Sequence, residues 1–337
     1  MKMVPVVYAA VPVSIIVAVA LIRKWKSRKW GKCLSNTCLK GKTYLITGAT
    51  SGIGLETTKA LIKRRARVIL ACRDVPKAKE VINEIRKKQP YGGELIPMHL
   101  DLASFESIEK FVEIIKTGFY KIDVLINNAG VAMPMELDLK TKEGFEIHFG
   151  VNHLGHFYLT KLLLEHLKRA SPSRIVIVSS TLHEKGKINF DDLNSKVDIE
   201  EAKQGKVKSR HITGYQNSKL MNVYFMRGLA DRLRGTGVDV NCCCPGFCYT
   251  NLFRYSIKWY HYILMAPVLL MFMKTAKQGA ETIVYCASEY HIGGQTCKFY
   301  RNCEEYESSY PFDKDVENKL WEVSEQLIKA RKPIPIS

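Results

Sequence analysis

The sequence predicts an α/β fold in which a doubly wound parallel sheet of the Rossmann type lies at the centre of three α/β/α layers. Two observations carry this prediction. Short apolar, β-branched runs alternate with longer amphipathic segments, and the first such run ends in a glycine-rich turn that leads into a helix. With 337 residues, 46% hydrophobic and 25% charged, the chain has a globular composition and can bury a full core.

An apolar segment precedes this fold. The run from Val4 to Ile22 is broken only by two prolines and one serine, and it has the length of ~20 residues with which a helix crosses a bilayer. From Arg23 to Lys42 there are eight basic residues and no acidic one, which favours the cytosolic side. We therefore expect residues 1–22 to be an uncleaved anchor and residues 23–40 a basic juxtamembrane linker. A cleaved signal peptide and, because Pro12 is central, a surface-lying segment are the alternatives.

The net charge of +18 does not indicate nucleic-acid binding. Much of the basic excess borders the apolar segment, where a basic cluster reports topology or anionic lipid, and no basic motif interleaved with aromatic residues follows. The ten cysteines have no framework spacing. Cys242, Cys243 and Cys244 alternate between the faces of a predicted strand, so they cannot form one metal site. We expect reduced, mostly buried thiols and no metal.

The first strand and its turn predict a phosphate cradle. Thr43-Tyr44-Leu45-Ile46-Thr47 reads as a buried strand, and a helix follows the turn. Gly48 suits a tight turn, Gly52 a close approach of a pyrophosphate, and Gly54 close packing of helix on strand. A helix N-terminus then presents free N–H groups to an anion. The cradle consists of Gly48, Thr50, Ser51, Gly52, Ile53 and Gly54.

The end of the second strand bears on the choice of cofactor. Residues 67–71 form this strand, and Arg73 and Asp74 follow it. An arginine there accommodates the 2′-phosphate of NADP, whereas an acidic residue binds the ribose 2′-hydroxyl of NAD. We expect NADP(H) in preference to NAD(H). The alternative is that Asp74 caps the next helix beside a solvated arginine, and Asp74 is also compatible with a ribose contact.

Two further strands end in polar residues. A helix over 75–88 leads to a strand over 94–100 that ends at Asp101-Leu102, where Asp101 suits either the adenine amino group or the N-cap of a helix over 104–120. A strand over 122–126 then runs into Asn127-Asn128-Ala129-Gly130, which suits a stabilised turn close to a cofactor.

A local conflict marks the next helix, predicted over 143–168. Asn152 lies inside it between Gly150 and Gly155, and neither Asn nor Gly favours a helix interior. Such a conflict indicates a kinked or functional position. His153 and His156 lack an acidic partner at the spacing of a zinc site, so we expect them to pack or to lie at the surface.

A candidate acid–base pair follows the fifth strand, residues 174–178, which ends in Ser179-Ser180. After a polar stretch over 181–213, Tyr215 and Lys219 are four residues apart and project from one face of a helix. A lysine cation favours the phenolate and lowers the pKa of the tyrosine, which lets the phenol act as general acid or base on an alcohol/carbonyl pair.

The rest of the chain completes the sheet. A strand over 238–243 runs into Pro245-Gly246, a strand over 295–301 is the last, and residues 313–331 form an amphipathic helix. Residues 257–273 are apolar and rich in Met and aromatics, and they read as a lid over a lipid-like substrate or as a buried helix pair.

Together these motifs resemble the short-chain dehydrogenase/reductase family over roughly residues 40–305. The marks are Thr47-Gly48 with Gly52-Ile53-Gly54, Asn127-Asn128-Ala129-Gly130, and Tyr215-x-x-x-Lys219 after Ser180. The resemblance implies that Ser180 bonds the substrate oxygen, Tyr215 exchanges its proton, Lys219 holds the nicotinamide ribose and Asn152 orders a water relay. It also implies cofactor contacts by Asp101, Leu102, Asn128, Ala129, Gly130, Tyr215, Lys219, Pro245, Gly246 and Thr250.

Within the family the chain resembles the microsomal retinol dehydrogenase-like branch. The anchor, Ala71-Cys72-Arg73-Asp74, Asn152-His153-Leu154-Gly155-His156-Phe157 and the serines with His183 carry this likeness. An insertion around 197–208 departs from it, and we expect that insertion to loop outward. We expect domains over 1–22, 23–40, 41–310 (with a lid over 257–273) and 311–337.

The resemblance implies an NADP(H)-dependent oxidoreductase that interconverts retinol and retinal on a membrane, with the endoplasmic reticulum expected and the catalytic domain facing the cytosol. The alternatives are a steroid, polyprenol or fatty aldehyde substrate, a nucleotide-sugar epimerase-type enzyme, and a non-catalytic membrane-anchored binding protein. The expected partners are an apolar small molecule and the membrane, without nucleic acid, and a homo-oligomer is compatible with the sequence.

Overall fold

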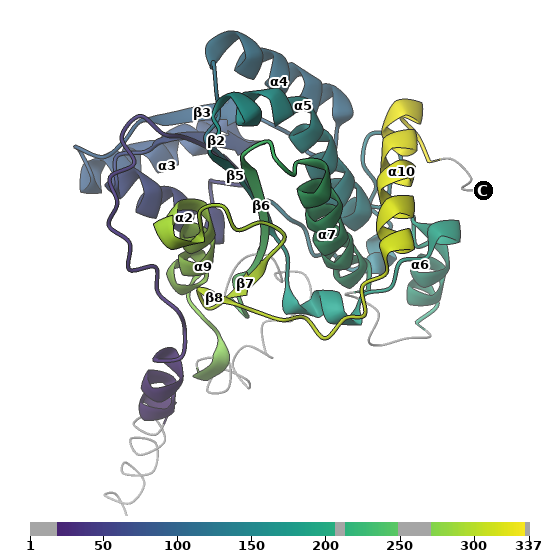
Figure 1. Cartoon of the computed structure of the whole chain (residues 1–337). Helices are drawn as coiled ribbons and strands as arrows, with labels where there is room; N and C mark the ends of the chain where they lie inside the picture. Colours follow the sequence, from purple (N-terminus) through teal and green to yellow (C-terminus); the bar gives the residue numbers. More distant parts are fainter. Residues whose placement is uncertain (1–18, 206–212, 249–270, 334–337) are drawn as a thin grey trace, which may run out of the picture.

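The computed structural model describes residues 19–205, 213–248 and 271–333, and these form one eight-stranded sheet between two layers of helices (Figure 1). The strand order is β3-β2-β1-β4-β5-β6-β7-β8, in which only the β7–β8 hairpin is antiparallel. The order reverses between β1 and β4, and ligands of open parallel sheets bind at the carboxyl ends of strands at such a point. The predicted Rossmann-type parallel sheet is confirmed.

The elements follow the predicted alternation closely. The strands are β1 Thr43–Thr47, β2 Arg67–Cys72, β3 Leu95–His99, β4 Val124–Asn127, β5 Ser173–Val178, β6 Val238–Cys244, β7 Phe299–Arg301 and β8 Glu304–Glu305. The α-helices are α2 Gly52–Lys63, α3 Val75–Lys88, α4 Phe105–Gly118, α5 Gly155–Arg169, α6 Lys196–Lys203, α7 Thr213–Arg232, α9 Ala276–Ser288 and α10 Lys314–Ala330. The predicted last strand over 295–301 is shorter than expected, because only its final three residues pair with β6.

Each face of the sheet has its own core. Tyr44 and Ile46 pack with apolar side chains of α2 and α9, whereas Leu45 points to the opposite core with α4, α5 and α7. The cysteines of β6 alternate in the same way, with Cys243 in the first core and Cys242 and Cys244 in the second. No disulfide links the described cysteines, and the described residues contain no cluster of His, Cys, Asp and Glu that could hold a metal ion.

The predicted helix over 143–168 begins later and in another form. Residues His148–Leu154 make a π-helix, and α5 continues from Gly155. A Cβ atom on Gly150 would lie 2.2 Å from Cγ2 of Thr141, and one on Gly155 would lie 2.6 Å from the carbonyl oxygen of Leu102. The two glycines are therefore required by close packing, and the conflict in the sequence marks a π-helix of the kind that often occurs at functional sites.

The polar stretch after β5 is more ordered than predicted. Residues of the insertion form the helix α6, which packs beside the 3-10 helix η1, Met135–Leu137, instead of only looping outward. Ile199 is buried in this contact, and Nζ of Lys203 lies 3.0 Å from a carboxylate oxygen of Asp138. Residues 206–212, which include the end of the predicted insertion, lie outside the described part of the chain.

The C-terminal helix α10 packs against α5 and α7 on one side of the molecule (Figure 1). Its N-cap is Asp313, whose side chain accepts from the N–H of Asp315. Trp321 lies 4.8 Å, between ring centroids, from Phe157, and Ser324 lies 3.0 Å from Nε2 of the buried His153. The helix therefore completes the core on this side of the sheet.

The N-terminal segment contacts the region expected to be the lid. Residues 19–27 are helical, and Nη1 of Arg23 donates to the carbonyl oxygen of Met273 over 3.1 Å. Residues 1–18, most of the predicted anchor, lie outside the described residues, and so do residues 249–270, which include most of the predicted lid over 257–273. Within the described part, no helix combines the length and the apolar character that a membrane span requires.

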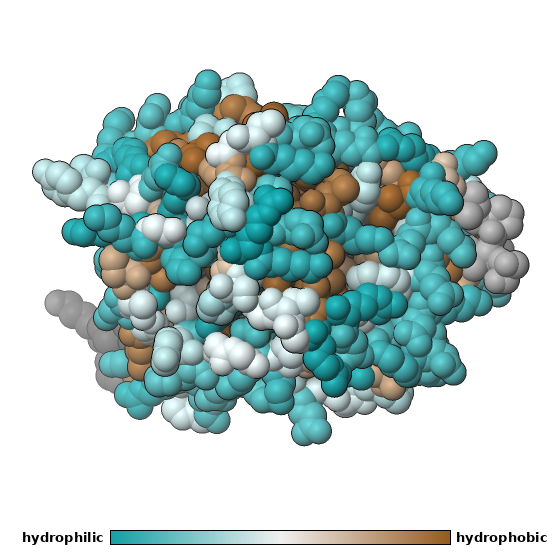
Figure 2. Space-filling model, turned by 45° about the horizontal axis from the view of Figure 1, so that its top comes forward, coloured by the Kyte–Doolittle hydropathy of each residue, from teal (hydrophilic) through white to brown (hydrophobic). Residues whose placement is uncertain are grey.

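The surface that Figure 2 shows is largely hydrophilic, with apolar side chains in separate patches. Much of the charge on α4 is locally paired. Lys110 pairs with Glu106 at 2.5 Å, and Lys116 with Glu113 at 2.7 Å. These are exposed pairs, which contribute little to stability, so they mark a solvated face and do not indicate a binding site.

Candidate active site

The glycine-rich turn brings the ends of β1 and β4 into direct backbone contact. Gly48 adopts φ +68°, and its N–H donates to the carbonyl oxygen of Ala71 over 2.9 Å. A Cβ atom on Gly48 would lie 3.0 Å from Cα of Ala129. A side chain is thus disfavoured at Gly48 both by its positive φ and by the neighbouring turn.

The other two glycines shape the entrance to α2. Gly52 has φ +54°, while a Cβ atom on Gly54 would lie 2.3 Å from the carbonyl oxygen of Gly48 and 2.6 Å from Nδ2 of Asn128. Ser51 occupies the N-cap of α2 without a capping hydrogen bond from its side chain, and the first turn contains no acidic residue. The helix dipole and the uncapped N–H groups therefore favour an anion there, so the cradle fits a dinucleotide pyrophosphate.

Thr47 joins the two turns and was not among the predicted site residues. Its hydroxyl oxygen accepts from the N–H groups of Asn128 and Ala129, both over 2.9 Å. In return, Nδ2 of Asn128 donates to the carbonyl oxygen of Thr47 over 2.8 Å. The signal available in the sequence was its place at the last position of β1, directly before the glycine turn.

The two acidic residues expected near the adenosine have local roles in the structure. Asp74 is the N-cap of α3 and accepts from the N–H of Lys77 over 2.9 Å, so the capping alternative is confirmed. Asp101 accepts from the N–H of Ala103, and the N-cap of α4 is Ser104. The predicted capping role of Asp101 was therefore wrong, because a serine nearer to the helix performs it. Arg73 is exposed at the end of β2.

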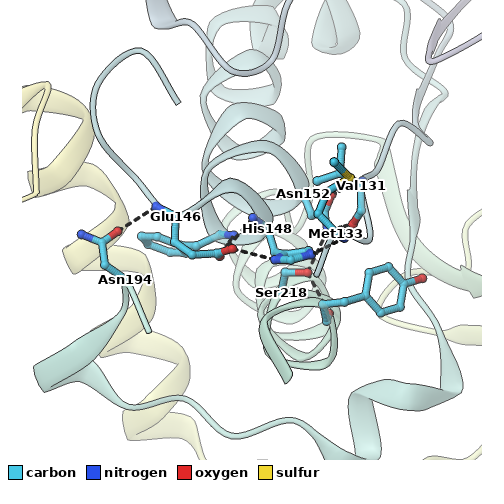
Figure 3. A network of polar contacts seen from close by, with 9 residues as sticks. Val131, Met133, Glu146, His148, Asn152, Asn194 and Ser218 are labelled. Carbon is cyan, nitrogen blue, oxygen red and sulfur yellow. Dashed lines mark hydrogen bonds and ion pairs between the residues drawn. The ribbon is translucent and has the colours of Figure 1, made fainter. Parts of the chain in front are cut away.

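Asn152 lies in the π-helix and clamps the loop after β4 to α7 (Figure 3). Its Oδ1 accepts from the N–H of Val131 over 2.8 Å, and its Nδ2 donates to the carbonyl oxygen of Val131 over 3.0 Å and to Oγ of Ser218 over 2.9 Å. Ser218 in turn donates to the carbonyl oxygen of Tyr215. Asn152 is fully buried, and its side chain is committed to protein groups.

A second buried network, which sequence reasoning missed, supports the same loop (Figure 3). The N–H of Met133 donates to Nε2 of His148 over 2.9 Å, so Nδ1 carries the ring proton and donates it to Glu146 over 2.6 Å. The other carboxylate oxygen of Glu146 accepts from the N–H groups of His148 and Phe149. Glu146 and His148 are nearly adjacent in the sequence, but nothing in their spacing indicates that they meet the loop.

Tyr215, Ser180 and Lys219 meet at the carboxyl ends of β5 and β6. The phenol of Tyr215 is hydrogen-bonded to Ser180, and Nζ of Lys219 lies 5.4 Å from the centroid of the tyrosine ring. The same Nζ donates to the carbonyl oxygen of Val178 over 2.9 Å. Ser179, by contrast, is buried and donates to the carbonyl oxygen of Lys219, so it is Ser180 that faces the phenol, as predicted.

The electrostatics of this group differ from the prediction. Burial is the largest influence on Tyr215 and raises the pKa of its phenol, although the hydrogen bond from Ser180 opposes the rise. The expected lowering of this pKa was therefore wrong for the free chain, because desolvation dominates and Lys219 is not among the main influences on the phenol. Burial also lowers the pKa of Lys219 to about 8, partly offset by the neighbouring cysteines of β6. Near neutral pH the site thus holds a neutral phenol beside a cationic lysine.

The remaining predicted residues border the same edge of the sheet. Gly246 adopts φ +89°, and a Cβ atom there would lie 3.3 Å from the side chain of Lys274. A Cβ atom on Gly130 would lie 3.4 Å from Oδ1 of Asn152 and 3.6 Å from Nζ of Lys219, which places this turn against both side chains. Thr250, the last predicted contact, lies outside the described residues.

This arrangement fits a dinucleotide whose pyrophosphate lies on the turn after β1 and whose reactive ring lies near Tyr215. The bare turn, the free helix N-terminus and the lysine cation are all suited to an anionic ligand. The pairing of a phenol with a serine hydroxyl at one point can transfer a proton to or from a substrate oxygen. The geometry is therefore that of an acid–base site beside a dinucleotide cradle.

The sequence matches the family model described as short chain dehydrogenase over residues 42–191 and 201–261. It is 42% identical to retinol dehydrogenase 14 of Homo sapiens over 86% of this chain and 87% of that protein. It is 41% identical to retinol dehydrogenase 12 of Homo sapiens over 89% of this chain and 90% of that protein. Retinol dehydrogenase 11 of Homo sapiens is 38% identical and spans 97% of both chains.

Solved structures share the fold. The crystal structure of an uncharacterized protein from Mycobacterium Paratuberculosis has a TM-score of 0.63 and 30% identity, covering 88% of this chain and 97% of that one. Salutaridine reductase from Papaver somniferum has a TM-score of 0.58 over 77% of this chain and 99% of its own, at 24% identity. With its family model, its relatives and its acid–base site, the chain belongs to the short-chain dehydrogenase/reductase family and is an alcohol-acting oxidoreductase of the retinol dehydrogenase-like branch.

Proposed function

We propose that the protein is an NADP(H)-dependent oxidoreductase that interconverts a retinoid alcohol and its aldehyde. The observation that carries the proposal is the hydrogen bond between Tyr215 and Ser180 beside Lys219, at the sheet edge that also holds the glycine cradle. The retinoid is supported by the names of the relatives, which are retinol dehydrogenases at about 40% identity over most of the chain.

The site residues divide the acid–base work. Ser180 and Tyr215 hold the substrate oxygen between their hydroxyl groups. Tyr215 then donates its proton to that oxygen in the reductive direction, which suits a phenol whose raised pKa keeps it protonated. The ammonium group of Lys219, 5.4 Å from the ring, stabilises the phenolate that remains. When bound, the nicotinamide supplies or accepts the hydride.

The preference for NADP(H) rests on the end of β2. The side chain of Asp74 is engaged in capping α3, and this leaves the exposed guanidinium of Arg73 to meet a 2′-phosphate. The raised pKa of Tyr215 and the use of NADPH both favour reduction of an aldehyde over oxidation of an alcohol. Steroid, polyprenol and fatty aldehydes are the next substrates to test.

The proposed function is tested by following the oxidation of NADPH in membranes that contain the protein, with all-trans-retinal as the substrate. We expect turnover with NADPH, slower turnover with NADH, and a loss of about 10³-fold or more in Tyr215→Phe, because that variant lacks the proton to be transferred. Tyr290→Phe, at an exposed position, is the matched control and should keep full activity.

Equal turnover in wild type and Tyr215→Phe would contradict the assignment of the catalytic residue. Turnover of other aldehydes but not of retinal would discard the retinoid and retain the chemistry. Binding of NADPH without turnover of any aldehyde would favour the non-catalytic binding protein.

The pH dependence follows from the charge on Lys219. Its pKa of about 8 means that the ammonium is present below that pH and is lost above it. We therefore expect kcat/KM for NADPH, which reports the free enzyme, to fall by about tenfold per pH unit above pH ~8. The raised pKa of Tyr215 keeps the phenol protonated over the same range. A Lys219→Arg variant keeps its charge and should lose this fall, and a wild-type profile that stays level through pH ~10 would contradict the assignment.

We also propose that the protein acts at a membrane, with its catalytic domain in the cytosol. The support is the apolar run over 4–22 together with the helix over 19–27, which carries Trp25 and the basic residues Arg23, Lys24 and Lys26. Leu21, Trp25 and Phe272 are exposed, and Nζ of Lys26 lies 3.5 Å from the centroid of the Phe272 ring. Such a mixture of aromatic and basic side chains suits the interface of an anionic membrane.

Extraction of microsomes with alkaline carbonate tests this placement. We expect the full chain to remain in the pellet and a chain lacking residues 1–22 to be released. Protease added to intact microsomes should digest the catalytic domain. Release of the full chain by carbonate would contradict the anchor. Full protection from the protease would contradict the cytosolic orientation.

A further inference from the structure

A buried histidine of α5 connects the cofactor turn to the π-helix. Nε2 of His156 lies 2.9 Å from Oγ1 of Thr47, and Nδ1 of His156 lies 3.1 Å from the backbone carbonyl oxygen of Asn152. His156 is 1% exposed, and Thr47 and Asn152 are fully buried.

The hydrogen bonds determine where its proton lies. The hydroxyl oxygen of Thr47 already accepts from two N–H groups, so its own proton is free to be donated, and Nε2 of His156 is the nearest acceptor. The alternative acceptor, the carbonyl oxygen of Ile126, is farther away, at 3.5 Å. Nδ1 must then carry the ring proton, because a carbonyl oxygen such as that of Asn152 only accepts.

The surroundings keep this ring neutral. Burial lowers the pKa of His156 to about 4, and the cation of Lys219 adds to the lowering, whereas the bond to Asn152 opposes it. The ring is therefore a fixed spacer with one donor and one acceptor. It is not a base available to the substrate, because it has no exposed edge and both nitrogens are bonded to the protein.

We propose that His156 is a positioning residue whose two ring nitrogens have separate roles. Through Thr47, Nε2 holds the cofactor turn after β1 in place. Through the carbonyl oxygen of Asn152, Nδ1 holds the π-helix and, with it, α7. The Nε2 side supports the hydroxyl that holds the N–H groups of Asn128 and Ala129. The Nδ1 side fixes the π-helix whose Asn152 side chain reaches Ser218 and thence the backbone of Tyr215. This inference rests on the proposed function, but the role of Nε2 in forming the cofactor turn does not depend on the identity of the substrate.

Two substitutions separate the bond to Thr47 from the bond to Asn152, because the amides of Asn and Gln lie at different distances from the backbone. In His156→Gln the amide reaches the position of Nε2 and can bond Thr47, but Asn152 loses its donor. In His156→Asn the amide stops at the position of Nδ1 and can bond Asn152, but Thr47 loses its acceptor. A buried polar group left unpaired costs ~1–3 kcal/mol, which corresponds to about 5- to 150-fold in the affected constant.

The test measures the Kd of NADPH by fluorescence titration, and kcat with saturating NADPH and retinal, for the full chain in detergent. For His156→Asn we expect a Kd raised about tenfold or more, with kcat within about threefold of wild type. For His156→Gln we expect kcat lowered about tenfold or more, with Kd within about threefold of wild type. His166→Gln is the matched control on the same helix. His166 is also buried, but no hydrogen bond joins its ring to Thr47 or to Asn152, so both constants should stay at the wild-type values.

Two results would overturn the proposal. One is that both variants match wild type in both constants. The other is that both variants raise Kd and lower kcat to the same extent, as general loosening of the core would produce. If wild type binds NADPH but does not reduce retinal, the proposed substrate is wrong. The comparison of Kd values then still tests whether Nε2 of His156 supports the cofactor turn.

A measurement on the wild-type chain covers the case in which a variant does not fold. Histidine labelled with ¹⁵N, assigned by comparison of the variants that do fold, reports the tautomer of each ring. We expect His156 to be a neutral Nδ1–H tautomer that does not titrate down to pH ~5. An Nε2–H tautomer, or protonation of this ring near its ordinary pKa, would overturn the proposal.

Discussion

The close contact between the turns after β1 and β4 is the constraint on which the rest of the site depends. A Cβ atom on Gly54 would lie 2.3 Å from the carbonyl oxygen of Gly48, and one on Gly48 would lie 3.0 Å from Cα of Ala129. Only glycine allows both approaches. The hydroxyl of Thr47 then accepts from the N–H groups of Asn128 and Ala129. The N–H of Asn128 also donates to the carbonyl oxygen of Ile126 over 3.0 Å, so the loss of this hydroxyl would fall mainly on Ala129, at a cost of ~1–3 kcal/mol.

From this contact a chain of hydrogen bonds leads to Tyr215. His156 joins Thr47 to the π-helix, and Asn152 joins the π-helix both to the loop at Val131 and to Ser218 on α7. The π-helix matters because it holds Asn152, whose buried side chain bonds both of these segments. Burial then determines the charges: it raises the pKa of the Tyr215 phenol and lowers that of Lys219 to about 8. The resulting pair, a neutral acid and a cation near neutral pH, suits reduction.

Much of this could be predicted from the sequence, because strand periodicity and glycine spacing are local signals. The helix α3 has the predicted bounds, and Ser180, Tyr215 and Lys219 meet as expected. What could not be predicted depends on three-dimensional contact. The pair of Glu146 and His148 has meaning only beside the loop at Met133, the α6 helix is stabilised by packing on η1, and the pKa of Tyr215 depends on a burial that the spacing of a lysine does not report.

The account is tested most directly by the affinity of Thr47→Val for NADPH, measured by isothermal titration beside wild type. Valine keeps the shape of threonine and removes only the hydroxyl. The N–H of Ala129 and the Nε2 of His156 then lose their partner, while the N–H of Asn128 keeps only its bond to the carbonyl oxygen of Ile126. We predict a folded variant, with an unchanged circular dichroism spectrum, that binds NADPH at least tenfold more weakly. A folded variant with the affinity of wild type would contradict the claim that the contact of the two turns forms the cofactor site.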